Sequence, residues 1–232
     1  MGLKDDLAAE VKSTFAAAWE EQIATSVPSA EDLRLNANHA KNLVTATVLY
    51  ADLDGSTNMV DGYQWSFSAE VYKNYLRCAA AVIKSEGGTI TAYDGDRVMA
   101  VFTGGSKNTS AVRAAMKINY AVVEIIRPAL KAQYPTSTFN LNHVVGVDMS
   151  QLRTARIGVR GDNDLVWIGH AANHAAKLTG ISEKPLWITK AVFENMHNDV
   201  KFSKGIAMWE RRAWTKMNNA EIYCSTYWWR IE

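Results

Sequence analysis

Apolar positions recur along the chain at two spacings, which predict alternating helices and strands. Apolar residues three or four positions apart, the period of an amphipathic helix, predict helices at 4–22, 66–86, 107–133 and 170–179. Short runs rich in β-branched and aromatic residues are typical of strands. The predicted strands are 44–51, 89–93, 97–102, 138–148, 154–160, 164–168, 206–214 and 220–230, with a strand and a helix near 186–197. Hairpins that alternate with helices predict an α+β fold, with helices packed on a mainly antiparallel sheet.

The start of the chain differs in pattern from the rest. Apolar side chains at every fourth position predict that residues 4–22 form an amphipathic helix docked on the body of the protein or on a partner. Residues 23–42 are mostly polar and are interpreted as a connector. The predicted division is a helix and connector at 1–43 and one compact domain at 44–232, which is long enough to bury its own core. The apolar residues of the helix are Leu7, Val11, Phe15 and Trp19.

The predicted strand at 44–51 runs directly into an acidic turn, Asp52-Leu-Asp-Gly-Ser-Thr57. Gly55 permits an unusual backbone turn and a helix begins nearby, so carboxylates and free backbone N–H groups are expected at one point. Carboxylate oxygens bind divalent cations, and backbone amides bind phosphate. Taken alone, the turn is equally well explained as a strand-to-helix connection with a capping residue.

A second acidic turn, Asp94-Gly-Asp96, separates the predicted strands 89–93 and 97–102. Its Asp-Gly pair favours a tight reversal, so we predict a hairpin with Asp96 at its tip. If this hairpin pairs beside the first strand, Asp96 lies next to Asp52. Two such carboxylates suit magnesium or manganese, and a pair of these ions can activate a hydroxyl nucleophile while neutralising a leaving phosphate.

Composition and charge narrow the classes of function. The formal net charge is +1, so no excess of basic residues favours nucleic acid or an anionic membrane surface. The sequence has no apolar run of roughly 18 residues, which a membrane-spanning helix needs, and its first residues lack the continuous apolar stretch of a signal peptide. The expectation is a cytoplasmic protein that binds neither nucleic acid nor membrane, and that holds any anionic ligand locally.

Between about residues 44 and 230 the sequence resembles the class III nucleotidyl cyclases, the superfamily of adenylyl and guanylyl cyclases. The likeness rests on an apolar strand that ends in Ala51-Asp-Leu-Asp-Gly-Ser-Thr57 and on Gly95-Asp96 in the next hairpin. It implies a cyclase-like α+β sandwich with a ferredoxin-like, mainly antiparallel sheet, and it makes 44–232 the catalytic domain.

The same resemblance implies a nucleoside triphosphate substrate and two divalent cations, Mn²⁺ or Mg²⁺. Asp52, Asp96 and the backbone carbonyl of Leu53 would be the metal ligands. The reaction implied is attack of the ribose 3′ hydroxyl on the α-phosphate, with release of pyrophosphate. The triphosphate would contact the backbone amides of Asp54, Gly55, Ser56 and Thr57.

A third motif of the family, Gly-x-x-x-Asn-x-Ala-x-Arg, is matched by Gly169-His-Ala-Ala-Asn-His-Ala-Ala-Lys177. The resemblance implies that Asn173 orients the ribose and that Lys177 stands where an arginine usually stabilises the transition state. A lysine supplies a point charge where an arginine supplies a planar fork, so the geometry must differ. In that family these residues reach the metal site of the other subunit, which implies a head-to-tail homodimer with composite sites. Arg160, in Gly158-Val-Arg160, resembles the triphosphate-binding arginine.

The positions that recognise a purine base in that family hold Ala92 and Val166 here, and neither side chain can form the required hydrogen bonds. Tyr50 lies two residues before Asp52, so both side chains point to the same face of the strand. This combination resembles the pyrimidine cyclases of bacterial anti-phage systems, which make cyclic UMP or cyclic CMP for a separate effector protein. Arg97 is placed to donate near the base or phosphates, although an exposed hairpin arginine and a core tyrosine are the simpler interpretations.

The prediction is a uridylate cyclase that converts UTP to 3′,5′-cyclic UMP and pyrophosphate as a second messenger for antiviral defence. The alternatives are a cytidylate cyclase, a purine cyclase and a cyclase-like domain that binds nucleotide without turnover. The acidic turn also matches the nucleophile loop of haloacid-dehalogenase-type phosphatases. That phosphatase fold requires a parallel sheet, which the predicted hairpin around Asp96 argues against.

Overall fold

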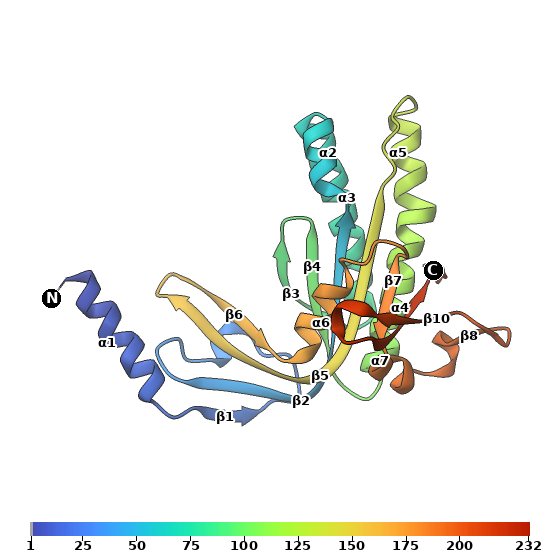
Figure 1. The fold of residues 1–232 in the computed structure, drawn as a ribbon. Coiled ribbons are helices and arrows are strands. Elements are labelled where there is room, and N and C mark those ends of the chain that lie inside the picture. The colour runs from blue at the N-terminus through green and yellow to red at the C-terminus, as the bar shows by residue number, and fades with distance from the viewer. Residues whose placement is uncertain (1) are drawn as a thin grey trace.

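A long, mainly antiparallel sheet organises the chain in the computed structural model, which describes residues 2–232 (Figure 1). Its strand order is β10-β11-β7-β5-β2-β4-β3, with β1 paired to β2 and β6 paired to β5. Only the β1–β2 and β5–β7 pairs within it are parallel. The strands are β1 (Glu20–Ile23), β2 (His39–Asp54), β3 (Thr89–Asp94), β4 (Arg97–Phe102), β5 (Asn142–Val159), β6 (Asp162–Ile168), β7 (Leu186–Thr189), β10 (Glu210–Trp214) and β11 (Ala220–Ser225). A separate hairpin joins β8 (Phe202–Ser203) to β9 (Ile206–Ala207).

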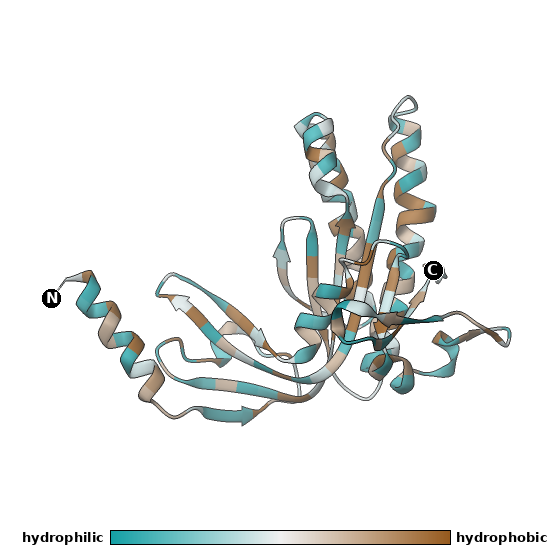
Figure 2. Cartoon of the chain, viewed as in Figure 1, coloured by the Kyte–Doolittle hydropathy of each residue, from teal (hydrophilic) through white to brown (hydrophobic). Residues whose placement is uncertain are grey.

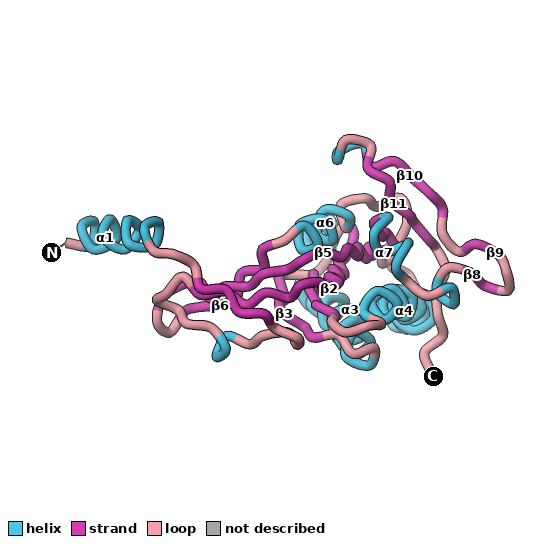
Figure 3. Tube along the Cα trace, turned by 90° about the horizontal axis from the view of Figure 1, so that it is seen from below, coloured by secondary structure: helices cyan, strands magenta, loops and turns pink. Residues whose placement is uncertain are grey.

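The helices lie on both sides of this sheet, with α3 and α4 on one side and α6 on the other (Figure 3). The helices are α1 (Leu3–Ala16), α2 (Ser56–Gly62), α3 (Trp65–Ser85), α4 (Lys107–Tyr120), α5 (Arg127–Gln133), α6 (His170–Leu178) and α7 (Lys190–Asn195). A π-helical segment, η2 (Ala121–Ile126), connects α4 to α5, so the predicted helix at 107–133 is continuous. The remaining helical elements of residues 2–232 are three short 3₁₀ turns: η1 (Ala30–Asp32), η3 (Asn198–Val200) and η4 (Thr215–Met217). The predicted α+β fold is confirmed.

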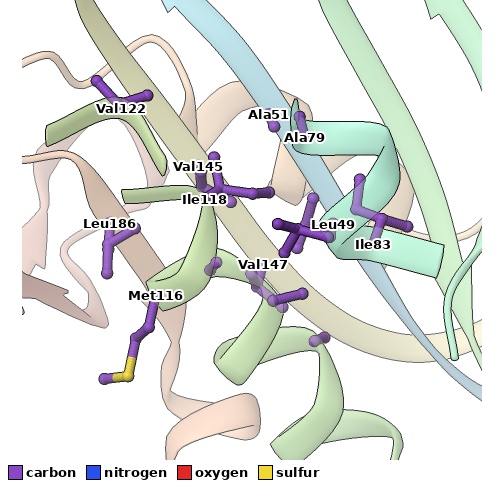
Figure 4. Packing of buried hydrophobic residues seen from close by; sticks show 14 of the residues in the cluster. Leu49, Ala51, Ala79, Ile83, Met116, Ile118, Val122, Val145, Val147 and Leu186 are labelled. Carbon is purple, nitrogen blue, oxygen red and sulfur yellow. The ribbon is translucent and has the colours of Figure 1, made fainter. Parts of the chain in front are cut away.

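Side chains that alternate along β2 build two cores. Leu49 and Ala51 are buried against α3, α4 and the neighbouring strand β5, as Figure 4 shows. Val48 and Tyr50 point to the opposite face, where they pack with the small apolar residues of α6. Fully burying one leucine contributes about 1.5–3 kcal/mol, so this two-sided burial fixes the register of the strand. The end of β2 at Asp54 is thereby held in place.

The strand β5 corrects the sequence prediction, which divided it into 138–148 and 154–160. The polar residues between these segments belong to one strand of 18 residues. Ser150 pairs with Ala46 of β2, and Leu152 pairs with Leu43 across a bulge. Because β2 pairs with this stretch, its polar side chains do not end the strand, and the Ser150 hydroxyl accepts a hydrogen bond from the amide of Ala171 in α6 (His170–Leu178).

The N-terminal prediction was too long, because α1 ends at Ala16. The side-chain amide of Asn38 donates to the carbonyls of Thr14 and Ala17, both at 2.8 Å, and so caps the helix end. The chain then extends into β1, and β2 begins at His39 inside the predicted connector. β2 therefore runs across the predicted boundary at residue 43, and the division into domains stays a prediction.

The apolar residues of the predicted N-terminal helix do not dock on the body of their own chain. None of the residues of α1 is buried, and the helix projects from one end of the sheet (Figures 1 and 2). Docking on the body is therefore wrong, and docking on a partner stays a prediction. The exposed fractions are 52% for Leu7, 54% for Val11, 88% for Phe15 and 57% for Trp19.

The aromatic C-terminal region forms fewer strand residues than predicted. The run at 206–214 divides into β9 and β10, and the strand expected at 220–230 ends at Ser225. Trp209 is buried, and its indole N–H donates to the carbonyl of Val200 at 2.7 Å. Trp214 is also buried, which agrees with a role in the core. The last residues are irregular and pack against α4 instead, where the ring of Trp228 lies 5.2 Å from that of Tyr120.

Candidate active site

Strand pairing brings the two acidic turns together at one edge of the α6 face. Asp52, near the end of β2, pairs with Arg97, the first residue of β4. Asp96 immediately precedes Arg97 in the β3–β4 turn, so its carboxylate lies close enough to Asp52 to act on it electrostatically. Both side chains are half-buried. The structure therefore places two carboxylates from distant parts of the sequence at one point.

Burial raises the pKa of Asp52 above its usual value, and the negative charge of Asp96 raises it further. Arg97 and a hydrogen bond from the Thr179 hydroxyl to Oδ2, at 3.2 Å, oppose this rise. Two partly desolvated carboxylates that repel each other form an oxygen-rich site that a divalent cation would stabilise. The residues present therefore fit a magnesium or manganese ion.

No group of three or more His, Cys, Asp or Glu side chains in residues 2–232 is arranged to hold a metal ion. A cation held by Asp52 and Asp96 would therefore complete its shell with backbone oxygens, water or substrate phosphates, as Mg²⁺ commonly does. The backbone carbonyl of Leu53, between two carboxylate-bearing residues at the end of β2, stays a predicted ligand at this position.

A buried tyrosine supports the end of β2 from the opposite face. The hydroxyl of Tyr75, in α3, donates to the backbone carbonyl of Asp52 at 3.1 Å. Burial raises the pKa of Tyr75 well above its ordinary value, so the phenol stays protonated as a donor. Sequence reasoning missed Tyr75 and Thr179, because Tyr75 follows the apolar pattern of its helix and Thr179 is the last residue of the helix predicted at 170–179.

The acidic turn leads into α2, which lies before the helix predicted at 66–86; the sequence predicted only that a helix begins near this turn. Gly55 adopts a φ of 76°, which L-residues rarely adopt, and its carbonyl accepts a hydrogen bond from the amide of Met59 at 3.2 Å. The amides of Ser56 and Thr57 belong to the first turn and point out of the helix end. Asp54 is half-buried beside them. Their contact with phosphates stays a prediction.

Tyr50 and Arg97 lie on the same face as Asp52, beside Ala92 of β3. Tyr50 is half-buried, and burial raises the pKa of its phenol, so the hydroxyl remains protonated at neutral pH. The guanidinium of Arg97 lies 3.9 Å from the exposed carboxylate of Asp94. Ala92, the Tyr50 phenol and the Arg97 guanidinium therefore lie together next to the two carboxylates.

Three predicted site residues, Arg160, Asn173 and Lys177, form no hydrogen bond with Asp52 in the described residues 2–232. Arg160 is exposed in the turn that joins β5 to β6. β5 pairs with Asp52 at Val144 and ends at Val159, so at about 3.3 Å per residue Arg160 lies tens of ångströms away along the strand. Val166 of β6 pairs with Ala155, also far along the arm that β5 and β6 form.

Asn173 and Lys177 are exposed on α6. The Nζ atom of Lys177 lies 4.0 Å from the sulfur of Met217, in η4. In residues 2–232 neither side chain forms a hydrogen bond with Asp52. One chain therefore gathers the metal-binding candidates and Tyr50, and it presents Asn173, Lys177 and Arg160 on other surfaces.

A mainly antiparallel sheet covered by helices on both faces, with two carboxylates where β2 ends and β4 begins, is the architecture of a class III nucleotidyl cyclase. The structure of the adenylyl cyclase CyaB from P. aeruginosa superposes with a TM-score of 0.67 at 21% identity, over 80% of this chain and 95% of that chain. No protein-family profile matches the sequence.

Sequence relatives narrow the class. A uridylate cyclase of Burkholderia cepacia is 58% identical over 100% of both chains, and a uridylate cyclase of Xanthomonas perforans is 50% identical, also over 100% of both chains. The chain belongs to the uridylate cyclase family and is a nucleotidyl cyclase. The mainly antiparallel sheet is not the parallel sheet that a haloacid-dehalogenase-type phosphatase requires, so that alternative is excluded.

None of the helices in residues 2–232 is long and apolar enough to span a membrane.

Proposed function

We propose that the protein converts UTP to 3′,5′-cyclic UMP and pyrophosphate. The observation that carries this proposal is the full-length identity of 58% to a uridylate cyclase. The site agrees with it in two respects. The carboxylates of Asp52 and Asp96 would supply a site for cations on a triphosphate, and Ala92, in the same cluster as Tyr50, offers no hydrogen bond to a purine.

Two divalent cations, Mg²⁺ or Mn²⁺, would be held by Asp52, Asp96 and the carbonyl of Leu53. When bound, they would lower the pKa of the ribose 3′ hydroxyl and neutralise charge that develops on the phosphates. Tyr75 and Thr179 hold the backbone and the carboxylate of Asp52 in place. The amides at the start of α2 would orient the triphosphate.

Incubation of the purified protein with each of the four ribonucleoside triphosphates and Mn²⁺ tests the proposal. Cyclic UMP and pyrophosphate are expected in equal amounts from UTP. If no nucleotide gives a cyclic product, the proposed cyclase activity of this site is wrong. Cyclic CMP alone would favour the cytidylate alternative, and cyclic AMP or cyclic GMP alone would exclude a pyrimidine enzyme.

Tyr50 is the residue proposed to limit the size of the base pocket. A Tyr50→Ala variant is expected to lower kcat/KM for UTP about tenfold or more and to lower the preference for UTP over ATP, because a pocket loses both bulk and a polar partner. The measurement is kcat/KM for both nucleotides. Tyr93→Ala, which removes an exposed tyrosine of β3, is the matched control. An unchanged ratio of UTP to ATP would remove Tyr50 from base selection.

We also propose a homodimer with composite sites. Asn173, Lys177 and Arg160 do not contact the Asp52 of their own chain, and a second copy in head-to-tail orientation would supply them. In such a dimer Asn173 orients the ribose, and Lys177 stabilises charge in the transition state. Arg160, at the tip of the β5–β6 arm, would bind the triphosphate.

Mixing two inactive variants tests this arrangement. Asp52→Asn and Lys177→Ala are each expected to be inactive alone, since every composite site then lacks one group. After exchange of subunits, half of the dimers are mixed, and each mixed dimer has one intact site, so activity recovers to about a quarter of the wild-type value. Rates are measured before and after mixing. No recovery, with subunit exchange demonstrated, would show that both residues act within one chain.

The product is proposed to be a second messenger in antiviral defence, acting on a separate effector protein. The support is the likeness to pyrimidine cyclases of anti-phage systems. Plaque counts on cells that carry the native locus, with and without Asp52→Asn, test the role.

A further inference from the structure

The side of α6 that faces the sheet carries a polar linkage that no part of the proposed chemistry uses. The Nδ1 atom of His174 lies 2.9 Å from Oδ2 of Asp148, on β5. The other carboxylate oxygen of Asp148 accepts a hydrogen bond from the hydroxyl of Thr189, at 2.5 Å. The side chain of Asp148 is only 4% exposed, and that of His174 is 25% exposed. An ionised carboxylate accepts hydrogen bonds only, so His174 donates through Nδ1.

This linkage lies in the middle of a three-point contact between α6 and β5. Alternate residues of β5 face the helix, because side chains alternate across a strand. A Cβ atom added to Gly146 would meet the carbonyl of Ala175 at 2.2 Å, so the two backbones touch there. Two residues on, Asp148 binds His174, and two further on, the Ser150 hydroxyl accepts a hydrogen bond from the amide of Ala171 at 3.0 Å.

The apolar contacts of α6 do not fix its rotation as strictly. Its buried residues are three alanines and one leucine, which present a smooth surface to the sheet. A polar pair with defined geometry selects one rotation, because a slipped helix leaves the buried carboxylate without a partner. Asn173 precedes His174 by one residue, about 100° around the helix, and Lys177 follows Asn173 by one turn. The rotation that joins His174 to Asp148 therefore sets where both exposed side chains point.

We propose that His174, held by Asp148, is a positioning residue that sets the orientation of Asn173 and Lys177 toward the active site of a second copy. This inference rests on the proposed function and on its composite dimer. His174 itself does not touch the substrate. Around it, the ring of Trp214 lies at 5.6 Å and that of His170 at 5.5 Å. A cleft of about 410 Å³ borders this group and leaves the helix space to shift when the linkage is lost.

The first test measures kcat and KM for UTP in His174→Ala and His174→Asn. The alanine variant is expected to lose about 10²-fold in kcat, the effect of displacing a catalytic group by about 1 Å, with KM within about threefold. The asparagine side chain places an amide donor near the former Nδ1, so His174→Asn is expected to recover kcat to within about fivefold of wild type. His197→Ala is the control, because His197 also pairs with an aspartate, Asp199 at 3.1 Å, but is exposed.

A second measurement separates positioning of the partner's site from an effect within one chain. The end of α6 also bonds Asp52 of the same chain through Thr179. If His174 acts on the partner's site, mixing His174→Ala with Asp52→Asn restores activity to about a quarter of wild type, whereas mixing it with Lys177→Ala restores none. Recovery with Lys177→Ala but not with Asp52→Asn would overturn the proposal, as would a kcat for His174→Ala equal to that of wild type.

Two controls keep the outcome decisive. If His174→Ala does not fold, as judged by circular dichroism, Asp148→Asn takes its place, because asparagine keeps the shape and weakens the linkage. It is expected to lower kcat about tenfold with KM unchanged, and an unchanged kcat would overturn the proposal. Wild-type protein without cyclic product from any nucleotide would contradict the proposed function itself, whereas an active wild type with an unaffected His174→Ala contradicts only the positioning role.

Discussion

An Asp52→Asn variant is expected to lose roughly 10³-fold or more in turnover of UTP while it keeps its fold. Metal assistance of this kind lowers the activation barrier by several kcal/mol. Each 1.4 kcal/mol changes the rate about tenfold. Asparagine has the shape of aspartate and can still accept the hydrogen bond from Thr179, so the support around the residue survives. The measurements are kcat with UTP and Mn²⁺ and a circular dichroism spectrum.

The same variant is expected to be more stable than wild type at pH 7 without metal. The pKa of Asp52 is raised in the folded protein, so the folded state binds more protons than the unfolded state between the ordinary and the raised pKa. Stability therefore falls as the pH rises through that window and stays lower above it. Removing the charge removes this penalty. Thermal unfolding from pH 3 to 8 should show a higher Tm for Asp52→Asn above the window and equal values below it.

Metal ions should reverse the order of stability. Mn²⁺ is expected to raise the Tm of wild type, since a ligand that binds only the folded state stabilises it, and to have little effect on Asp52→Asn. Asp61→Asn, which changes an exposed carboxylate of α2, is the control and should behave as wild type. Turnover by Asp52→Asn within tenfold of wild type, or an equal Mn²⁺ shift in both proteins, would remove Asp52 from the metal site.

The features predicted correctly from the sequence depend on local chemistry. The β-branched strand before Asp52, the turn at Gly55 and the Asp-Gly reversal before Asp96 are each encoded within a few residues. The pairing of β2 with β4 then brings the turns at Asp52 and Asp96 together. The sequence prediction had to assume that these two strands are neighbours. The helix predicted at 170–179 agrees with α6, His170–Leu178, to within one residue at its end.

The features that were missed depend on contacts between residues far apart in the sequence. β5 continues through polar residues because β2 pairs with it along this stretch, and nothing in its own sequence identifies that partner. The bonds of Thr179 and Tyr75 to Asp52 span more than twenty residues each, and single side chains of these types carry no pattern. The linkage of Asp148 to His174 was missed for the same reason.

The N-terminal helix shows the converse error. Its apolar spacing is real, but periodicity reports only that one face avoids water, and it does not identify the covering surface. Figure 2 shows α1 clear of the body of the chain. The separation of Arg160 from Asp52 has a similar origin, since a motif identifies a residue but not the distance of its side chain from the rest of the site.

Replacing Gly146 with alanine is expected to lower both stability and activity, since this residue is where α6 rests directly on β5. The new Cβ would lie 2.2 Å from the carbonyl of Ala175 and 2.8 Å from the Cβ of Leu178, and backbone at that distance must move. Overpacking of this kind costs about 1–3 kcal/mol. For a chain of this length each kcal/mol lowers Tm by about 2–4 °C, so a decrease of roughly 2–12 °C is expected.

The loss of activity in Gly146→Ala should follow from displacement of α6 and not from the metal site. Turnover of UTP is expected to fall at least about tenfold, because the helix carries Asn173 and Lys177, while the Mn²⁺-dependent rise in Tm is retained. Gly105→Ala is the matched control, because no atom lies within 4 Å of its added Cβ and its backbone is not in the left-handed region. Full activity in Gly146→Ala would mean that α6 can shift on the sheet without harm, and its placement would then not limit the reaction.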